Sequence, residues 1–524
     1  MPARSWRRSP LATCTGVLVI VLALTGCAST PPGPGSAAVV TVDALRSTGR
    51  AATELNTQII YPGVLDRVPG GPALLADYAA PKIRLMLGTD GAYLPDHPPT
   101  LPAGWTKGAW DFRTIDELVT ATFAAGARPV LNIGYMPDWM WNCATAQPVD
   151  ATFAPFGEYA ARLVSYYNRG SFIAEDGRVI TNPAGTAHRV DTWEIWNEPD
   201  LWTLACVGPT GKGPGLPSLS PATYVAVWNA LAPRMRAVDP TIKLAGPTTA
   251  RGVEGNAYAY LDLLMRSGDP KPDIATLHGY GSHDERDLDR CLFDGYASGS
   301  GCLADGIPSL TKMLTRIQTS APGRPTWVTE ANALASYGID AKARNWGPLG
   351  AAWRASAFAR LSAMGVDAIF DYSFVHPGGD QFSAVDPTTG TRLLPYWTNR
   401  ELARAFPVGA TIVASGTDRR GIDTLAVRLA GGAINVLIVN RIVASASDVG
   451  GAGQGLTIEL QLAGVTSAGE LSVRSLDAGT PLDSGPVTRK VGAGTSVTLA
   501  LGGYSATIVS YEPAVARAPS EATR

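Results

Sequence analysis

The chain has 524 residues, with 43 lysines and arginines against 45 aspartates and glutamates, which gives a formal net charge of -2. Hydrophobic residues make up 45% and charged residues only 17% of the sequence, so a large core can form and global disorder is excluded. The near-neutral balance argues against a nucleic-acid partner, because phosphate binding leaves a basic footprint. Length and composition predict a globular protein of two or more domains.

The first 26 residues have the pattern of a bacterial lipoprotein signal. Arginines near the N-terminus precede an apolar run at 16–24, and the letters L-T-G-C that end at Cys27 resemble a lipobox. The apolar run is too short for a comfortable membrane-spanning helix. The resemblance implies cleavage before Cys27 and lipidation of its thiol, with residues 27–37 as a Pro/Gly tether. We therefore expect an extracytoplasmic protein, lipid-anchored to the bacterial cell membrane; an ordinary signal peptide or an uncleaved anchor is the alternative.

Four cysteines remain after such processing: Cys143, Cys206, Cys291 and Cys302. In the oxidising compartment that a signal peptide implies, an even number of cysteines is read as disulfides. Of the three possible pairings we favour Cys291 with Cys302, which enclose a short Gly/Ser-rich loop, and hence Cys143 with Cys206. A zinc site is the alternative, but no C-x-x-C motif or nearby histidine supports it, so we expect no metal and no cofactor.

Residues 56–404 repeat one pattern, in which a short apolar or β-branched run is followed by a loop and a helical stretch. The strand candidates lie at 58–61, 83–87, 129–133, 192–196, 243–245, 274–277, 326–329 and 368–372. Helical stretches lie between them, for example at 114–124, 156–167, 221–238, 258–267, 309–319 and 350–364. Eight alternating units close most naturally as a (β/α)8 TIM barrel, an α/β fold. An open doubly wound sheet is the rival, but no glycine-rich phosphate motif follows the first strand.

The residues that flank this region have a different pattern. Residues 405–513 show short alternating runs separated by Gly, Asp and Ser turns, which predicts a C-terminal β-sandwich. The segment 38–55 contains the run A-V-V-T-V-D-A-L, and we expect it to add a strand to the sandwich. The last residues, 514–524, are expected to be disordered.

Two glutamates stand at the ends of predicted barrel strands. Glu198 lies in W-E-I-W-N-E-P-D after the fourth strand, and Glu330 lies in T-W-V-T-E-A-N after the seventh. Because barrel active sites form at the C-terminal ends of the strands, the two carboxylates are expected to face each other across one pocket. Such a pair suits glycoside hydrolysis, in which one carboxyl protonates the leaving oxygen and the other attacks the anomeric carbon. Either glutamate alone would be read as an ordinary solvated acid.

N-E-P on the fourth strand and T-E on the seventh resemble clan A glycoside hydrolases, which retain the anomeric configuration. The stretches at 126–137, 193–201 and 273–280 narrow the resemblance to glycoside hydrolase family 39. It implies a retaining glycosidase acting on an extracytoplasmic oligo- or polysaccharide, with Glu198 as general acid/base and Glu330 as nucleophile. The alternatives are another clan A family with a different sugar, a carbohydrate-binding lipoprotein without turnover, and the solute-binding lipoprotein of a transporter.

The resemblance also implies roles for residues around the two glutamates. Asn197 is expected to hydrogen-bond the sugar 2-hydroxyl, and His278 and Tyr280 to orient and hydrogen-bond around Glu330. Arg84 is either a site residue or a buried salt-bridge partner of Glu194. Aromatic side chains near the expected top-face loops are candidates to stack on sugars, and each is also open to plain packing: Trp110, Trp139, Trp141, Trp202 and Tyr135.

Two positions depart from the family's pattern. Met86 stands where a histidine is expected, and the expected strand-eight tryptophan is replaced within residues 370–374. Both positions shape the subsite that holds the reacting sugar. The sequence therefore leaves open the sugar, the linkage, endo or exo action, and the oligomeric state.

Overall fold

The computed structural model describes residues 37–61, 63–87, 107–201, 206, 216–250, 257–294, 302, 306–335, 340–376, 381–466 and 468–514. The expected signal peptide, the lipidation site Cys27, nearly all of the tether and of the C-terminal tail, and Trp202 lie outside these residues. The chain from Ala37 onward forms one compact unit.

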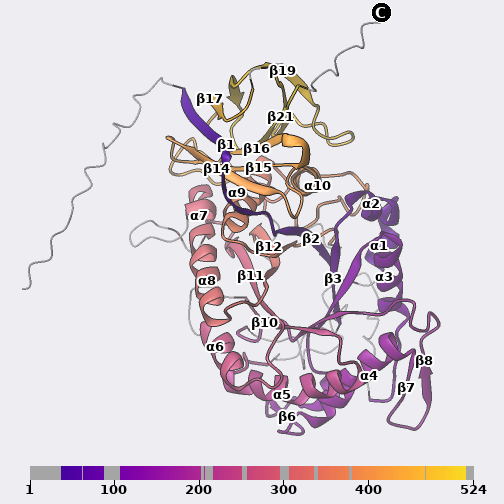
Figure 1. The fold of residues 1–524 in the computed structure, drawn as a ribbon. Coiled ribbons are helices and arrows are strands. Elements are labelled where there is room, and N and C mark those ends of the chain that lie inside the picture. The colour runs from indigo at the N-terminus through magenta and orange to yellow at the C-terminus, as the bar shows by residue number, and fades with distance from the viewer. Residues whose placement is uncertain are drawn as a thin grey trace, which may run out of the picture. The chain divides into compact units, whose positions relative to one another are not determined.

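Within the described residues, parallel strands close into an eight-stranded barrel, which confirms the predicted fold class (Figure 1). The barrel strands are β2 (Glu54–Ile59), β3 (Lys82–Leu87), β4 (Arg128–Ile133), β9 (Thr192–Ile195), β10 (Lys243–Thr249), β11 (Ile274–Ser282), β12 (Thr326–Leu334) and β13 (Ala368–Asp371). Each pairs with the next along the chain, and β13 returns to β2. Helices such as α6 and α8 lie outside the ring of strands.

The helices are α1 (Val64–Arg67), α2 (Gly71–Tyr78), α3 (Arg113–Ala124), α4 (Ala154–Arg169), α5 (Pro221–Val238), α6 (Ala257–Ser267), α7 (Asp289–Asp294), α8 (Gly306–Ser320), α9 (Pro348–Ala363) and α10 (Leu394–Ala405), with short 3-10 turns η2 (Asp138–Met140) and η3 (Ala430–Gly432). Two small hairpins interrupt the repeat: β5 (Trp141–Asn142) with β6 (Gln147–Pro148), and β7 (Ser171–Ile173) with β8 (Val179–Thr181). Helix α4 buries residues that recur at helical spacing, from Phe156 to Tyr167, whereas α9 is buried along nearly its whole surface.

The first barrel strand differs from its predicted position, because it begins at Glu54 rather than at Gln58. Side chains of a strand point to opposite faces in turn, so Glu54, Asn56 and Gln58 share the face that points into the barrel. These residues are polar, and Asn56 and Gln58 are fully buried. The continuous apolar run that marks a buried parallel strand is therefore missing from this segment.

The barrel interior contains its own apolar layer. Six buried residues from five different strands form a cluster separate from the main core: Val130, Ala245, Ile274, Trp327, Ala368 and Phe370. Strands around the whole ring can meet in this way only inside the barrel. The layer supports the polar side chains nearer the C-terminal ends of the strands, where Arg84 follows Lys82 on the inner face of β3.

The remaining described strands form one nine-stranded sheet, in the order β19-β18-β21-β16-β15-β14-β1-β17-β20. They are β1 (Ala38–Arg50), β14 (Thr411–Thr417), β15 (Ile422–Arg428), β16 (Ile434–Asn440), β17 (Leu456–Ala463), β18 (Glu470–Leu476), β19 (Arg489–Ala493), β20 (Ser496–Leu501) and β21 (Ser505–Glu512). Val473 near one end and Leu499 at the other belong to one buried cluster, so the sheet curls into a sandwich-like domain. The N-terminal strand β1 pairs with β14 on one side and β17 on the other.

Both expected disulfides are present in the described chain, Cys143–Cys206 and Cys291–Cys302. The first joins the loop after β4 to the loop after β9, two neighbouring barrel strands.

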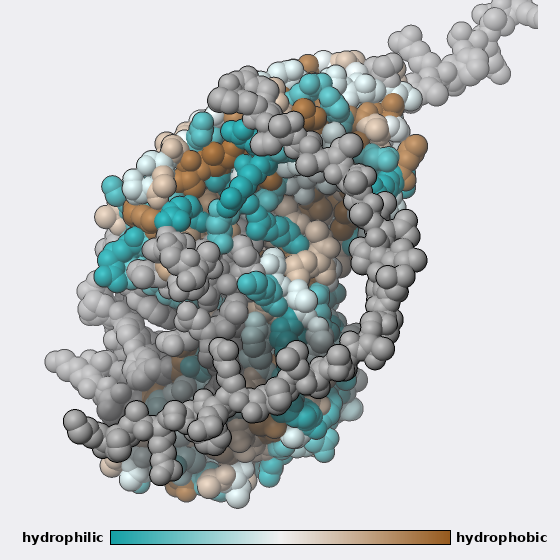
Figure 2. Space-filling model, turned by 90° about the vertical axis from the view of Figure 1, so that its left-hand side faces the viewer, coloured by the Kyte–Doolittle hydropathy of each residue, from teal (hydrophilic) through white to brown (hydrophobic). Residues whose placement is uncertain are grey.

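No helix within the described ranges is long and apolar enough to cross a membrane. The face drawn in Figure 2 mixes hydrophilic and hydrophobic residues over its described part.

Candidate active site

The loop after β9 carries Glu198 in a left-handed backbone conformation. Trp196 and Glu198 have φ values of 72° and 48°, which side-chain-bearing residues rarely adopt. The backbone N–H of Glu198 donates to the carbonyl of Thr248 at 3.1 Å, and Asn132 donates to the carbonyl of Trp196 at 2.7 Å. These contacts hold the turn, which aims the Glu198 side chain across the mouth of the barrel.

A β-bulge turns Glu330 into the barrel. The sequence predicts a strand that ends at Thr329, but β12 continues to Leu334, so Glu330 lies within it. Val328 pairs with Leu277 and Glu330 with His278, so Thr329 is an extra residue. Trp327 belongs to the interior layer, and strict alternation would point Glu330 outward. The extra residue reverses that direction, as bulges beside active sites do.

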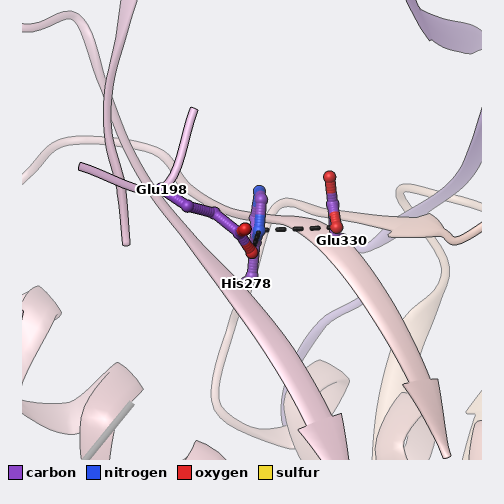
Figure 3. Close-up of side chains that lie close together, drawn as sticks. All are labelled: Glu198, His278 and Glu330. Atoms are coloured by element: carbon purple, nitrogen blue, oxygen red, sulfur yellow. Dashed lines mark hydrogen bonds and ion pairs between the residues drawn. The ribbon is translucent and has the colours of Figure 1, made fainter. Parts of the chain in front are cut away.

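His278 stands between the two carboxylates (Figure 3). Its Nδ1 lies 2.7 Å from Oε1 of Glu198 and 3.5 Å from Oε2 of Glu330. One oxygen of each carboxylate and a ring nitrogen of His278 all lie within 4.8 Å of one another. The His278 side chain is fully buried, whereas those of Glu198 and Glu330 are 15% and 7% exposed. The structure thus brings the two predicted glutamates and His278 together.

Two donors hold the carboxylate of Glu330. The Tyr280 hydroxyl donates to Oε2 at 2.5 Å, and Nη1 of Arg84 donates to Oε1 at 2.8 Å. The same guanidinium donates through Nη2 to Oδ1 of Asn197 at 2.7 Å and through Nε to Oε2 of Glu194 at 2.6 Å. Arg84 therefore contacts Glu330 and also forms the buried salt bridge with Glu194, so the two alternatives do not exclude each other; its role in the site stays a prediction.

The two glutamates have different electrostatic surroundings. Burial raises the pKa of Glu198 to about 8, the charge of Asp200 adds to the rise, and Arg84 opposes it. Burial also raises the pKa of Glu330, but Arg84 and the Tyr280 hydrogen bond favour its ionised form. Burial lowers the pKa of His278, which keeps the imidazole neutral at pH 7. With a pKa of about 8, Glu198 therefore holds a proton at neutral pH.

The cluster of two carboxylates and one imidazole has the donor types of a cation site. The guanidinium of Arg84 already places a positive charge on one Glu330 oxygen, and Tyr280 occupies the other. A metal ion bound to Glu330 would add a second positive charge beside the Arg84 guanidinium. The donor set therefore suits proton transfer better than metal binding.

The aromatic residues that are predicted to stack on sugars differ in their surroundings. Tyr135 reaches the site, since its hydroxyl accepts from Nδ2 of Asn197 at 3.4 Å. Trp139 lies in η2 after β4, partly buried, with the Lys107 ammonium 5.9 Å from its ring centroid. Trp110 stacks within an aromatic cluster, and Trp141 is buried. Their packing contacts account for Trp110 and Trp141, and a sugar-binding role of Trp139 stays a prediction.

An apolar wall adjoins the Tyr280 side of the site. Ile60, Met86, Tyr372 and Phe382 form a buried cluster against which Tyr280 packs. The rings of Tyr280 and Tyr372 are 6.2 Å apart. Met86 and Tyr372, the latter from the segment 370–374, therefore belong to one apolar surface at the ends of β2, β3 and β13.

Sequence reasoning missed two polar residues beneath the site. Gln58 of β2 accepts from Nη1 of Arg84 at 2.9 Å, and Asn132 of β4 donates to Glu194 at 2.9 Å. Both are fully buried. A polar residue inside an otherwise apolar strand run, as in P-V-L-N-I, is the signal that could have identified Asn132.

No family model and no curated protein matches this chain in sequence. Solved structures do match its fold. They include a monomeric β-xylosidase from Caulobacter crescentus, with a TM-score of 0.61 at 18% identity, covering 91% of this chain and all of that one. A family 39 glycoside hydrolase from Xanthomonas axonopodis pv. citri has a TM-score of 0.59 at 16% identity, covering 93% of this chain and 100% of its own.

A third matching structure is a family 51 α-L-arabinofuranosidase from Thermotoga petrophila, with a TM-score of 0.59 at 13% identity. The alignment covers 91% of this chain and 100% of that enzyme. At these identities the likeness shows a shared fold, a barrel followed by a β domain over nearly the whole length of each chain.

Proposed function

We propose that this chain is a retaining glycosidase of the clan A type, similar to glycoside hydrolase family 39, with Glu198 as general acid/base and Glu330 as nucleophile. The observation that carries the proposal is the pair of carboxylates from β12 and the loop after β9, whose oxygens lie within 4.8 Å. Retaining enzymes hold their carboxyl groups ~5–5.5 Å apart, and inverting enzymes ~6.5–9.5 Å. The likeness to solved glycosidases supports the same reading.

In the first step the ionised carboxylate of Glu330 attacks the anomeric carbon. Glu198 gives its proton to the glycosidic oxygen, the bond between that oxygen and the anomeric carbon breaks, and the leaving group departs as an alcohol. The products of this step are a glycosyl ester on Glu330 and a carboxylate on Glu198. The raised pKa of Glu198 supplies the proton at neutral pH.

In the second step the Glu198 carboxylate takes a proton from water, and the water oxygen attacks the anomeric carbon. The ester bond breaks, Glu330 leaves as a carboxylate, and Glu198 is protonated again. Two inversions at one carbon give net retention. Arg84 and Tyr280 stabilise the returning charge on Glu330, because each donates a hydrogen bond to one of its oxygens.

Asn197 is placed to bind the reacting sugar. Arg84 donates to its Oδ1, which directs the amide Nδ2 away from the guanidinium and toward Tyr135. One amide N–H donates to Tyr135, and the second remains as a donor for the sugar 2-hydroxyl, the contact that the family resemblance implies.

We further propose that the protein acts outside the cytoplasm, on an oligo- or polysaccharide, while anchored to the membrane through lipid on Cys27. The L-T-G-C string supports the anchor, and two disulfides in the described chain support an oxidising compartment. If the proposal is correct, Cys27→Ser releases the protein from the membrane fraction. Equal membrane retention of the Cys27→Ser variant would contradict it.

The function is tested by screening the purified enzyme against aryl glycosides and cell-wall polysaccharides, and by following the first-formed anomer with NMR. The proposal predicts a product of the same configuration as the substrate. It also predicts that Glu330→Gln abolishes turnover, whereas Glu158→Gln, a control at a side chain 57% exposed on α4, leaves it unchanged. An inverted product, or wild-type activity in Glu330→Gln, would refute the assignment.

A further inference from the structure

A third buried carboxylate, Glu194, lies beneath the two reacting ones. It sits on β9, and its side chain has no exposed area. Its Oε2 accepts from Nε of Arg84 at 2.6 Å and from Nδ2 of Asn132 at 2.9 Å. Burial acts to raise the pKa of Glu194, but the charge and hydrogen bond of Arg84 hold this pKa below its usual value, which favours the ionised carboxylate.

Glu194 determines where the Arg84 guanidinium points. The guanidinium is planar, and its N–H groups form a rigid fork, so fixing Nε also fixes the directions of Nη1 and Nη2. Nη1 donates to Glu330 at 2.8 Å, and Nη2 donates to Asn197 at 2.7 Å. A carboxylate at Nε therefore positions the nucleophile and the sugar-binding amide through one shared partner.

The charge balance around Arg84 changes during double displacement. In the resting enzyme the guanidinium lies between two carboxylates, Glu194 and Glu330. When Glu330 becomes a glycosyl ester it carries no charge, and Arg84 loses one of its two anionic partners. A fully buried cation without a counterion is strongly unfavourable. Glu194 is the anion that remains.

We propose that Glu194 is a positioning residue, the permanent counterion that holds Arg84 on Glu330 and Asn197 and keeps it neutralised while Glu330 is esterified. The proposal rests on the double-displacement function above, since in that cycle the charge of Glu330 is removed when the covalent intermediate forms. It places the second partner of Glu194, Asn132, as the residue that orients the Glu194 carboxylate.

Glu194→Gln removes the negative charge but keeps the hydrogen bond, because the glutamine oxygen can still accept from Nε of Arg84. With Glu194 neutral, the unshared Arg84 charge favours ionisation of Glu330. In the pH profile of kcat/KM, the acid limb then moves to lower pH by about one unit, which is the size of the pKa shift that a nearby charge causes. The less basic nucleophile reacts more slowly, so kcat/KM falls by up to about tenfold for the same shift, with KM changed less than kcat.

The matched control is Glu54→Gln, which neutralises the partner of Lys82, a residue on the same inner face of β3 as Arg84. It is expected to leave the acid limb in place. A folded Glu194→Gln enzyme with the wild-type acid limb and kcat/KM would overturn the proposal. So would equal shifts in the two variants, since these would indicate a general effect of removing one negative charge from the barrel.

A second measurement needs no variant. The wild-type enzyme is trapped as a slow-hydrolysing fluorinated glycosyl-enzyme, and its crystal structure is determined. We expect Nε of Arg84 to remain at hydrogen-bond distance from Glu194, and Nη2 to remain on Asn197. An ester on Glu330 with Arg84 turned away from Glu194 would overturn the proposed role alone, whereas absence of any ester would overturn the proposed function together with it.

Discussion

Replacement of Glu198 by glutamine removes the proton donor while keeping the size and polarity of the side chain. In the folded enzyme the pKa of Glu198 is raised to about 8, from an ordinary value of 4.5. At pH 7 a group with a pKa of 8 is about 90% protonated, whereas one with a pKa of 4.5 is about 0.3% protonated. Burial and the Asp200 charge thus raise the acid form by a factor of roughly 300.

The loss in Glu198→Gln depends on the leaving group. General acid catalysis contributes about 10²–10⁴ in rate when the leaving oxygen needs a proton. A phenyl or alkyl glycoside should therefore lose about that factor in kcat/KM, while a dinitrophenyl glycoside, whose leaving group is stable as an anion, should lose much less. Its second step still needs Glu198 as base, so kcat falls and a burst of dinitrophenol precedes slow turnover.

The assay measures kcat/KM for aryl glycosides of graded leaving-group pKa, with and without azide. Azide needs no general base, so it should restore turnover of the dinitrophenyl substrate in the variant and give a glycosyl azide of retained configuration. If Glu198→Gln lost the same factor on every leaving group, and azide had no effect, Glu198 would not be the acid/base.

Three further predictions concern the surroundings of the two glutamates. Asp200→Asn removes a charge that raises the pKa of Glu198, so the basic limb of kcat/KM, near pH 8 in the wild type, should move to lower pH. Tyr280→Phe removes a donor that favours ionised Glu330, so the acid limb should move up and kcat should fall about 10- to 100-fold. Cys143→Ser with Cys206→Ser opens a disulfide spanning 63 residues, and the free energy of unfolding should fall by about 2–4 kcal/mol in a denaturant titration. An unmoved limb of the pH profile in Asp200→Asn or Tyr280→Phe would contradict the electrostatic role given to that residue. Unchanged stability of the cysteine variant would contradict the stabilising role of the disulfide.

The sequence contained enough information to predict the barrel because most of its strands are apolar runs between helical stretches. Five of the predicted strands overlap structured strands that extend further, and β12 is the clearest case. Its last residues, A-N-A-L, are buried on both faces, so they show no alternation that would mark them as strand. The predicted position of the first strand was wrong for a different reason. Its inward residues Asn56 and Gln58 are polar, so the segment lacks an apolar run.

The site was predictable as a pair of glutamates and less so as a network. The positions of Glu198 and Glu330 follow from strand ends, but the bulge at Thr329 that aims Glu330 depends on pairing with β11 and leaves no local signal. The two roles of Arg84 stayed alternatives in the sequence, because only the folded barrel shows that one guanidinium reaches Glu194 and Glu330 at once.

The central claim is that Glu330 becomes covalently attached to the sugar. The direct measurement is mass spectrometry of enzyme incubated with an activated glycoside that carries fluorine beside the anomeric carbon, followed by peptide mapping. Double displacement predicts a mass increase of one fluoroglycosyl group, located on the peptide that contains Glu330 and absent in Glu330→Gln. Inactivation with the label on another residue, or turnover of cleavable glycosides without any trapped ester, would contradict it.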